Sequence, residues 1–315
     1  MARIMNAIKM GYFPTPPRIF ELVSGWLTSP DGDEQKWRLL DPCCGKGEAA
    51  QLADLVGGDC ETWGVELSPQ RAEEASRMMT KVYNTGWRQT RVNRESVSLL
   101  WLNPPYDSDL DGTGRRLEIG FLRNSAPALV NGGVLVYIIP RHILGYKDAA
   151  RLLAGHFDNL VIRRFPDGEY ERFKQVVVLG RKKPYKTPTG DEVDAIRALT
   201  DATADIPPLD AQKKSWEWDW PMAIPPAPED ARFRRVSISR REQVARAYSA
   251  GWPDSLLRAM EYKQQVDFTP VLPPKKGHIS MIMSSGVRGI MRLDKDGREM
   301  LAKGRTIKKA VTRTE

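Results

Sequence analysis

The feature that most constrains the fold is an alternation of short apolar runs with segments of helical periodicity between residues 17 and 182. The runs predict strands at 38–40, 61–67, 97–102, 132–140, 159–165 and 174–182. The periodic segments predict helices at 17–27, 48–56, 68–83, 117–129 and 147–153. Strands that alternate with helices form a mostly parallel sheet covered on both faces. The last two predicted strands leave no room for a crossover helix, so we expect them to pair antiparallel.

Composition supports a globular chain with a sizeable core. The 315 residues are 41% hydrophobic and 28% charged, which is ordinary for a folded protein. No apolar run approaches the length of a membrane span, and the first residues lack the apolar core of a signal peptide. Cys43, Cys44 and Cys60 match neither a disulfide framework nor a zinc spacing. We therefore expect free thiols, no metal site, no membrane contact and a cytoplasmic location.

The composition changes after Pro184, which suggests three regions: a domain at 1–185, a Pro/Trp-rich linker at 186–235 and a small basic region at 236–315. The linker carries Trp216, Trp218 and Trp220, which suit either an extended segment over a surface or one face of a strand. A capping box at Ser239 predicts a helix that ends near Gly251. Residues 289–304 predict a hairpin with an Asp-Gly turn.

Positive charge is concentrated at the C-terminal end. The chain has a net charge of +8, and residues 271–315 hold eleven Lys or Arg against four Asp or Glu, a net of +7. A polyanion such as nucleic acid and a merely solvated basic face fit this pattern about equally. His278 in this region has no apparent partner acid or nucleophile, which favours a structural hydrogen bond over catalysis.

A glycine-containing turn, Asp41-Pro42-Cys43-Cys44-Gly45-Lys46-Gly47, follows the first strand and precedes a helix. Such a turn lets the backbone approach a ligand at a helix N-terminus. Glu66, at the tip of the next strand, is placed to hold ribose hydroxyls, as in a dinucleotide fold. Asp41 argues against a nicotinamide cofactor, because a carboxylate there suits a ligand with an ammonium group.

The third strand ends in Asn103-Pro104-Pro105-Tyr106, at the sheet edge where open α/β sheets bind ligands. The Asn103 amide oxygen and the Pro104 carbonyl can both accept hydrogen bonds from one exocyclic NH2 group, and the prolines fix the backbone direction. Tyr106 offers a stacking face for a planar group. This arrangement would turn the nitrogen lone pair toward an incoming methyl group.

The motifs "DPCCGKG", "GVEL" and "NPPY" resemble the central motifs of class I S-adenosylmethionine-dependent methyltransferases, in the amino-methylating branch that includes N6-adenine DNA methyltransferases. The N-terminal "GYFPTPPRIFELV" resembles the motif of TaqI-like enzymes, which carry the catalytic domain first. The resemblance covers about residues 11–182. It implies a Rossmann-like fold with a mostly parallel seven-stranded sheet and an antiparallel last strand, S-adenosyl-L-methionine as cofactor, and nucleic acid as partner, DNA rather than RNA.

The resemblance also implies roles for particular residues. The cofactor would be bordered or held by Tyr12, Thr15, Pro16, Asp41, Pro42, Gly45, Gly47 and Glu66. The target amine would be held by Asn103, Pro104, Pro105 and Tyr106. An aromatic residue in the loop before the last strand would stack on a flipped base, with Phe165 the first choice and Phe173 the second.

One departure from the family pattern leaves alternatives open. The family usually has an acid after the third strand that contacts the cofactor adenine, and here Glu95 is the one acid between Asn84 and Ser98, with no clear Gly-Asp pair. Either a side chain such as Asn93 makes this contact, or the affinity for the cofactor is reduced. A non-catalytic nucleic-acid-binding subunit is therefore one alternative. An RNA base or a protein glutamine as acceptor is another. A specificity or nuclease partner subunit, and roles in restriction-modification, mobile-element protection or regulation, also fit.

Overall fold

The computed structural model describes residues 14–30, 35–106, 116–201, 203–211 and 221–236, together with the backbone of 291–295 and 298–302. The chain divides into two compact units, Met1–Ser239 and Arg240–Glu315.

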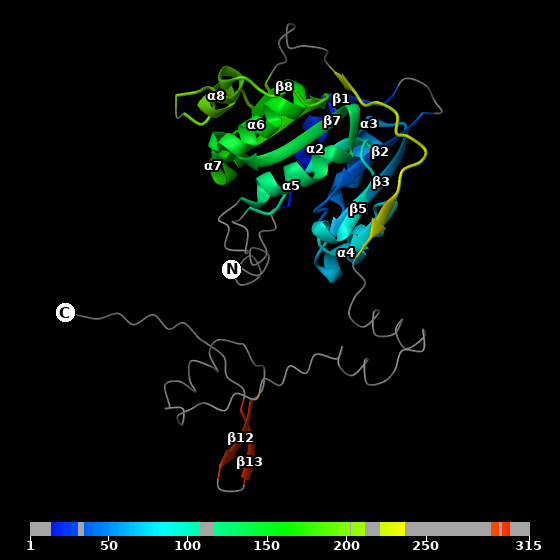
Figure 1. Ribbon diagram of the computed structural model, residues 1–315, viewed down its shortest axis with the longest axis vertical. Helices are drawn as coiled ribbons and strands as arrows, with labels where there is room; N and C mark the ends of the chain where they lie inside the picture. The colour runs from blue at the N-terminus through cyan, green and yellow to red at the C-terminus, as the bar shows by residue number, and fades with distance from the viewer. Residues whose placement is uncertain are drawn as a thin grey trace, which may run out of the picture. The chain divides into compact units, whose positions relative to one another are not determined.

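A seven-stranded sheet forms the centre of the first unit (Figure 1). In spatial order its strands are β4 (Lys81–Asn84), β3 (Asp59–Glu66), β2 (Lys36–Asp41), β6 (Val97–Leu102), β7 (Leu129–Pro140), β9 (Gln175–Lys182) and β8 (Phe157–Arg164). Strand β9 runs antiparallel to both of its neighbours, and the other neighbouring pairs are parallel. The predicted mostly parallel sheet with an antiparallel last strand is confirmed.

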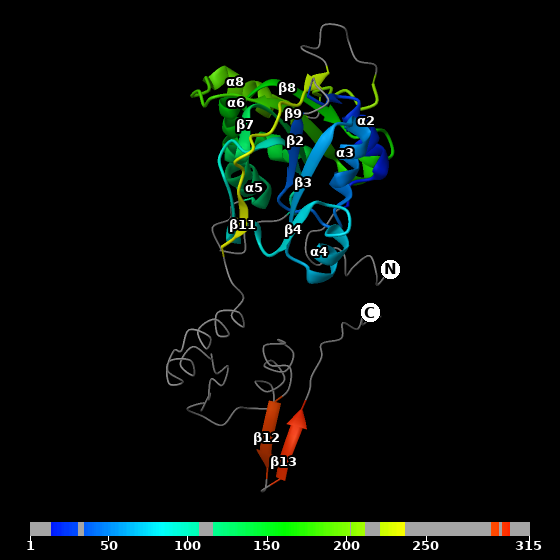
Figure 2. The same cartoon turned by 90° about the vertical axis from the view of Figure 1, so that its right-hand side faces the viewer.

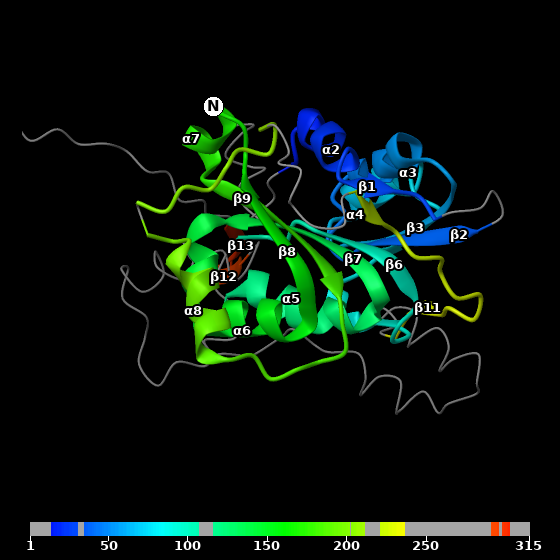
Figure 3. The same ribbon diagram turned by 90° about the horizontal axis from the view of Figure 1, so that it is seen from above.

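Helices cover both faces of this sheet, as the view along its edge shows (Figure 3). One face carries α2 (Pro17–Ser24), α3 (Gln51–Val56) and α4 (Pro69–Ala75), and the other carries α5 (Leu117–Ser125), α6 (Lys147–His156) and α8 (Gly190–Ala198). Successive residues of a strand point to opposite faces of the sheet. Leu39 packs in the core with α2 and α3, and Leu40 packs in the core with α5 and α6. This period of two explains why the central strands are apolar throughout.

Two predicted helices are shorter than their sequence pattern suggested. The segment expected as a helix over 68–83 is helical only in α4, and β4 adds an edge strand because Val82 and Tyr83 pair with β3. The helix expected over 117–129 ends at Ser125. Pro127 lies in the 3-10 turn η3 (Ala126–Ala128), and β7 then begins at Leu129, earlier than the glycines suggested.

Residues 186–235, expected as a linker, contribute elements to the first unit. Helix α8 lies beside α6 (Figure 3), β10 (Met222–Ala223) pairs with β1 (Leu27–Thr28), and β11 (Phe233–Arg235) pairs with β5 (Thr90–Val92). Apolar side chains anchor this segment in the two cores: Val193, Ile196, Ile206, Leu209, Met222, Ile224 and Phe233. The three tryptophans between β10 and residue 211 lie outside the described residues.

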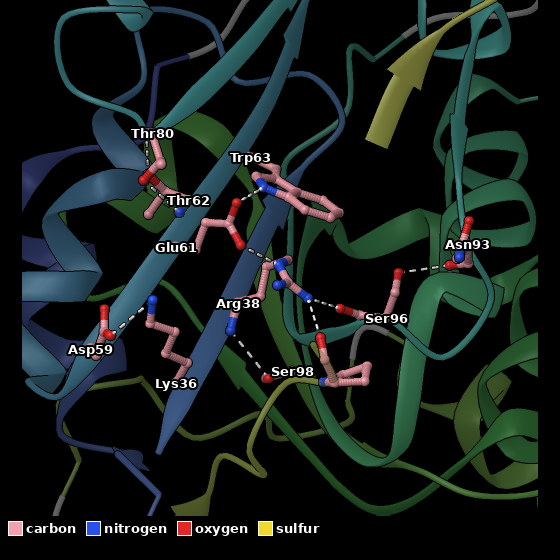
Figure 4. A network of polar contacts seen from close by, with 11 residues as sticks. Lys36, Arg38, Asp59, Glu61, Thr62, Trp63, Thr80, Asn93, Ser96 and Ser98 are labelled. Carbon is pink, nitrogen blue, oxygen red and sulfur yellow. Dashed lines mark hydrogen bonds and ion pairs between the residues drawn. The ribbon is translucent and has the colours of Figure 1, made fainter. Parts of the chain in front are cut away.

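A buried arginine, Arg38 in β2, also holds the segment 186–235 in place (Figure 4). The Arg38 guanidinium pairs with Glu61 at 2.7 Å and donates to the carbonyls of Ser96 at 2.6 Å and Pro228 at 3.2 Å. It also lies 4.4 Å from the ring centroid of Trp63, whose indole N–H donates to Glu61. Satisfying a buried charge with several partners avoids the cost of an unpaired ion.

In the second unit, β12 (Met291–Lys295) and β13 (Arg298–Ala302) form the predicted antiparallel hairpin. The helix expected from Ser239, and His278, lie outside the described residues. Within the part of the chain that the structure describes, no helix has both the length and the apolar character needed to span a bilayer.

The remaining short elements connect the main layers. They are the 3-10 turns η1 (Glu48–Ala50), η2 (Trp87–Gln89) and η4 (Arg141–Gly145), and helix α7 (Glu169–Phe173), which lies between β8 and β9.

Candidate active site

A cavity of about 260 Å³ opens at the carboxyl ends of β2, β3 and β6. This edge is where the strand order reverses, because β2 has β3 on one side and β6 on the other. The cavity brings together seven of the predicted site residues: Thr15, Asp41, Pro42, Gly45, Glu66, Asn103 and Pro105. Residues separated by up to 90 positions therefore line one cavity.

The turn after β2 uses its own N–H groups internally. The Cys43 N–H donates to Asp41 Oδ1 at 3.0 Å, the Gly45 N–H donates to Glu66 Oε2 at 3.1 Å, and the Gly47 N–H donates to the Cys44 carbonyl at 2.7 Å. The expectation that these groups point at a ligand is corrected. Asp41, Glu48 and Glu66 line the cavity against a single cation, Arg71, so its wall is rich in acceptors and unsuited to a pyrophosphate.

Asp41 is a carboxylate buried in the cavity wall, with 4% of its surface exposed. Burial raises the pKa of Asp41 to about 7; the hydrogen bonds from Cys43 oppose this increase, and the nearby Glu66 and Glu48 charges add smaller increases. A cationic ligand would stabilise the ionised form that burial disfavours.

Glu66 is held at the tip of β3 by several donors. Its Oε1 accepts from the Ser68 N–H at 2.7 Å and from two Arg71 nitrogens at 3.1 and 2.6 Å. Its Oε2 accepts from the Gly45 N–H, so Glu66 joins the glycine turn to the start of α4. A carboxylate oriented in this way is pre-positioned to accept further hydrogen bonds from hydroxyl groups.

The Asn103 amide is oriented from both ends. Its Nδ2 donates to Thr15 Oγ1 at 3.0 Å, and its Oδ1 accepts from the Tyr106 hydroxyl at 2.6 Å. The Cys43 thiol donates to the Asn103 backbone carbonyl at 3.2 Å. An amide oxygen has two lone pairs, so Oδ1 can accept a second hydrogen bond from a ligand amine.

Gln175 extends this chain of hydrogen bonds, and sequence reasoning missed it. Its Nε2 donates to the Tyr106 hydroxyl from the first position of β9, where Gln175 is buried. Burial raises the pKa of Tyr106 well above its usual value, so this hydroxyl stays protonated and can donate to Asn103. The sequence signal for this role was a glutamine at the start of the strand expected to be antiparallel, where a buried polar side chain needs a hydrogen-bond partner.

Helix α2 and the residues just before it place Pro14, Thr15 and Phe20 in the cavity wall. Phe20 stacks on Trp101 with ring centroids 4.8 Å apart, and both rings line the cavity. Pro16 precedes Pro17 at the helix start, so the chain enters α2 with Thr15 beside Asn103. Tyr12, predicted to border the cofactor, lies outside the described residues.

Gly47 has a structural role and does not line the cavity. It adopts φ +89°, and a Cβ at this position would lie 2.9 Å from the backbone Cα of Ala75 in α4. The glycine therefore permits close packing of the turn against α4, and its expected contact with the cofactor stays a prediction.

We expect Gly47→Ala to lower the free energy of unfolding by about 2–4 kcal/mol, because left-handed backbone strain adds to a clash with main chain. Gly132→Ala is the matched control, since Gly132 has φ +81° and a Cβ there would meet nothing within 4 Å. The control should cost only about 1 kcal/mol. Urea denaturation of both variants tests this, and equal losses would contradict the packing role.

The two aromatic residues predicted to stack on a flipped base differ in their burial. Phe165 is fully buried in the core with α2 and α3, so it offers no ring face to a base and the first choice is corrected. The alternation along β8 turns this side chain inward. Phe173, at the end of α7, is partly exposed and remains a prediction.

The residues suggested to replace the missing acid lie away from the cavity. Asn93 and Glu95 do not line the cavity; Asn93 instead donates to the Asp230 carbonyl at 3.4 Å. Thr85, Gly86 and Trp87 form one wall of the cavity after β4, and sequence reasoning missed them. The sequence signal for this wall was a tryptophan, Trp87, three residues after the "KVYN" strand.

The seven-stranded sheet with one antiparallel strand, and a ligand cavity at its switch point, define a Rossmann-like methyltransferase fold. The chain belongs to the Uncharacterised methyltransferase family (DUF6094), whose model matches residues 1–214. No curated protein matches the sequence.

Solved structures with a similar fold include a predicted O-methyltransferase from Agrobacterium tumefaciens, with a TM-score of 0.37 and 19% identity over 59% of this chain and 98% of that chain. TrmN from Thermus thermophilus aligns with a TM-score of 0.40 and 19% identity over 56% of this chain and 51% of its own. P. horikoshii TYW2 in complex with MeSAdo aligns with a TM-score of 0.37 and 12% identity, covering 54% and 65%.

Proposed function

We propose that this methyltransferase uses S-adenosyl-L-methionine to methylate an exocyclic amino group, the N6 amine of adenine in DNA. The observation that carries the proposal is the doubly oriented Asn103 amide at the edge of an acceptor-lined cavity.

The cavity residues fit this cofactor. Asp41 is a buried carboxylate suited to an α-ammonium group, and Glu66 is suited to ribose hydroxyls. When bound, the cofactor would supply an electrophilic methyl group on its sulfonium. The internally satisfied turn argues against a nicotinamide dinucleotide, which needs free N–H groups for its pyrophosphate.

Asn103 would hold and polarise the target amine. Its Oδ1 and the Pro104 carbonyl would accept the two amine hydrogens, which fixes the direction of the nitrogen lone pair. The same two acceptors would stabilise the positive charge that develops on nitrogen during transfer. Thr15 and Tyr106 act as positioning residues, since each holds one end of the amide.

An adenine in duplex DNA must leave the base stack to reach Asn103. Tyr106 and Phe173 would offer aromatic surfaces to the flipped base. Both are partly exposed, and Tyr106 is hydrogen-bonded directly to Asn103.

The proposal is tested by incubating the purified protein with radiolabelled S-adenosylmethionine and, separately, unmethylated duplex DNA, total RNA and a cell protein extract. Label in DNA that digests to N6-methyladenosine supports it. Label only in RNA or protein would assign an RNA base or a glutamine amide as the acceptor. No label despite cofactor binding would favour a non-catalytic subunit or the need for a partner subunit.

Cofactor binding should release protons below neutral pH. Because the pKa of Asp41 is about 7 in the free protein and an ammonium partner lowers it, binding of S-adenosylhomocysteine at pH 6 should release close to one proton. At pH 8, where Asp41 is already ionised, the release should fall to about a tenth of a proton. Calorimetry in buffers of different ionisation enthalpy measures this, and pH-independent release would contradict the assignment of Asp41.

A further inference from the structure

A second hollow, of about 900 Å³, lies next to the cofactor cavity, and Trp87 lines both. Six cationic residues line it, from η2, from β5 and the loop after it, from α5 and the residue before it, and from the start of α6: Arg88, Arg91, Arg94, Arg116, Arg123 and Lys147. Asp148 is the single acid in this lining, and it pairs with Arg123 at 3.0 Å.

Three of these cations form no ion pair with an acid in the part of the chain that the structure describes. Arg116 is neutralised by the buried Glu118 at 2.6 Å. Arg91, Arg94 and Lys147 are exposed, and none of them forms an ion pair with the residues that the structure describes. The hollow therefore keeps a positive potential toward solvent.

The charge continues across the two-stranded ribbon of β5 and β11, which the ribbon diagrams show beside the main sheet (Figures 1 and 2). Arg91 and Arg234 are direct partners in this antiparallel register, so both side chains lie on the same face. Both are exposed. Like charges placed directly opposite destabilise a ribbon, and an anion between them would remove this cost.

The other face of the ribbon anchors it to the domain. Phe233 is buried and stacks on Trp63 with ring centroids 5.0 Å apart, and the Tyr83 hydroxyl donates to its carbonyl at 3.1 Å. Val92, opposite Phe233, packs against the same core. The arginines therefore project from a rigid support, which favours a built binding surface.

A third hollow, of about 810 Å³, lies along this ribbon and shares Arg91 with the second. Its lining includes Arg232, Arg234 and Arg235 against one acid, Asp230. The positive surface thus extends from the edge of the cofactor cavity across the ribbon. A small anion needs only one or two such contacts, whereas a polyanion can use the whole series.

We propose that the β5–β11 ribbon and the hollow beside it bind the sugar–phosphate backbone of the nucleic acid whose base enters the cofactor cavity. The identity of that nucleic acid rests on the function proposed above. The ribbon belongs to the first unit, Met1–Ser239, and would then position the substrate. Arginine suits this task because its planar fork matches phosphate oxygens.

The test uses the full chain and fluorescence anisotropy with an unmethylated DNA duplex at several salt concentrations. Arg91→Glu with Arg94→Glu should weaken binding at least about tenfold and reduce the slope of log affinity against log salt by about 2. The matched control is Lys183→Glu with Lys186→Glu, which changes the net charge equally at residues that line neither hollow. The control should stay within about twofold of the unmodified protein.

Arg91→Gln with Arg94→Gln provides a milder variant, and thermal unfolding checks that each variant is folded. Equal weakening in the ribbon variant and its control would show a response to net charge alone and overturn the proposal. Unchanged affinity in the ribbon variants would do the same. Single-stranded DNA and RNA of the same sequence identify which backbone is preferred. Poly-glutamate that competes as well as DNA at equal charge would overturn the assignment to nucleic acid in favour of an acidic protein.

Methyl transfer is measured separately, so the two proposals can fail independently. Asn103→Ala should leave the salt slope of DNA binding unchanged, because Asn103 is assigned to a base amine and not to a phosphate. If DNA binding depends on the ribbon but no nucleic acid is methylated, the ribbon inference stands and the proposed acceptor fails. If DNA is methylated and the ribbon variants have an unchanged KM for it, the proposed function stands and the ribbon inference fails.

Discussion

Asn103→Ala is expected to lower the rate of methyl transfer by about 10³-fold or more, while the affinity for S-adenosylhomocysteine changes by less than about twofold. The alanine removes the acceptor for the target amine and one of the two groups that would stabilise its developing charge. Asn103 lies at the edge of the cavity that faces Thr15 and Tyr106, whereas the cofactor is assigned to Asp41 and Glu66. Transfer assays and calorimetry measure the two quantities separately.

The matched control is Asn131→Ala, because Asn131 is an exposed amide on β7 that does not line the cavity. It should leave both transfer and cofactor affinity unchanged. Loss of cofactor binding together with transfer in Asn103→Ala would mean that Asn103 supports the cavity as a whole, and would contradict its assignment to the amine.

Asp41→Asn is expected to have two effects of opposite sign. Cofactor affinity should fall about 30-fold or more, because a charge-assisted hydrogen bond to the ammonium group is lost. Stability without cofactor should rise at pH 8, by on the order of 2 kcal/mol, because the variant no longer buries an ionised carboxylate. The asparagine Oδ1 can still accept from the Cys43 N–H.

The pH dependence of that gain follows from the raised pKa of Asp41, which is about 7 in the folded protein against 3.8 in the unfolded chain. Between these values the unfolded chain binds fewer protons than the folded protein, so the stability of the unmodified protein falls as pH rises. The gain of Asp41→Asn should therefore be full above pH 7 and shrink toward pH 4. Urea denaturation at pH 5 and pH 8 measures it.

Asp59→Asn is the control for this variant, since Asp59 is exposed at the opposite end of β3. It should change neither cofactor affinity nor the pH dependence of stability by much. An Asp41→Asn variant that binds the cofactor normally would place the ammonium group elsewhere in the cavity.

Parts of the fold were predictable because they depend on local pattern. Alternation of strand and helix over residues 17–182 indicated the parallel sheet, and the missing crossover before β9 indicated its antiparallel pairing. The end of α4 was not predictable in this way, because helical periodicity continues past Ala75 while pairing with β3 draws Val82 and Tyr83 into a strand. Here a tertiary contact overrides local propensity.

The chain's sequence by itself determined the sheet, its switch point and the residues that meet there, including Asp41, Glu66 and Asn103, because residues at the carboxyl ends of neighbouring parallel strands must share one edge. Only the tertiary structure decided how each side chain is used. It turned Phe165 into the core, gave Gly47 a packing role and joined Gln175 to Asn103 through Tyr106. It also paired Arg91 with Arg234, which lie 143 positions apart, because a ribbon's register depends on contacts that no local pattern specifies.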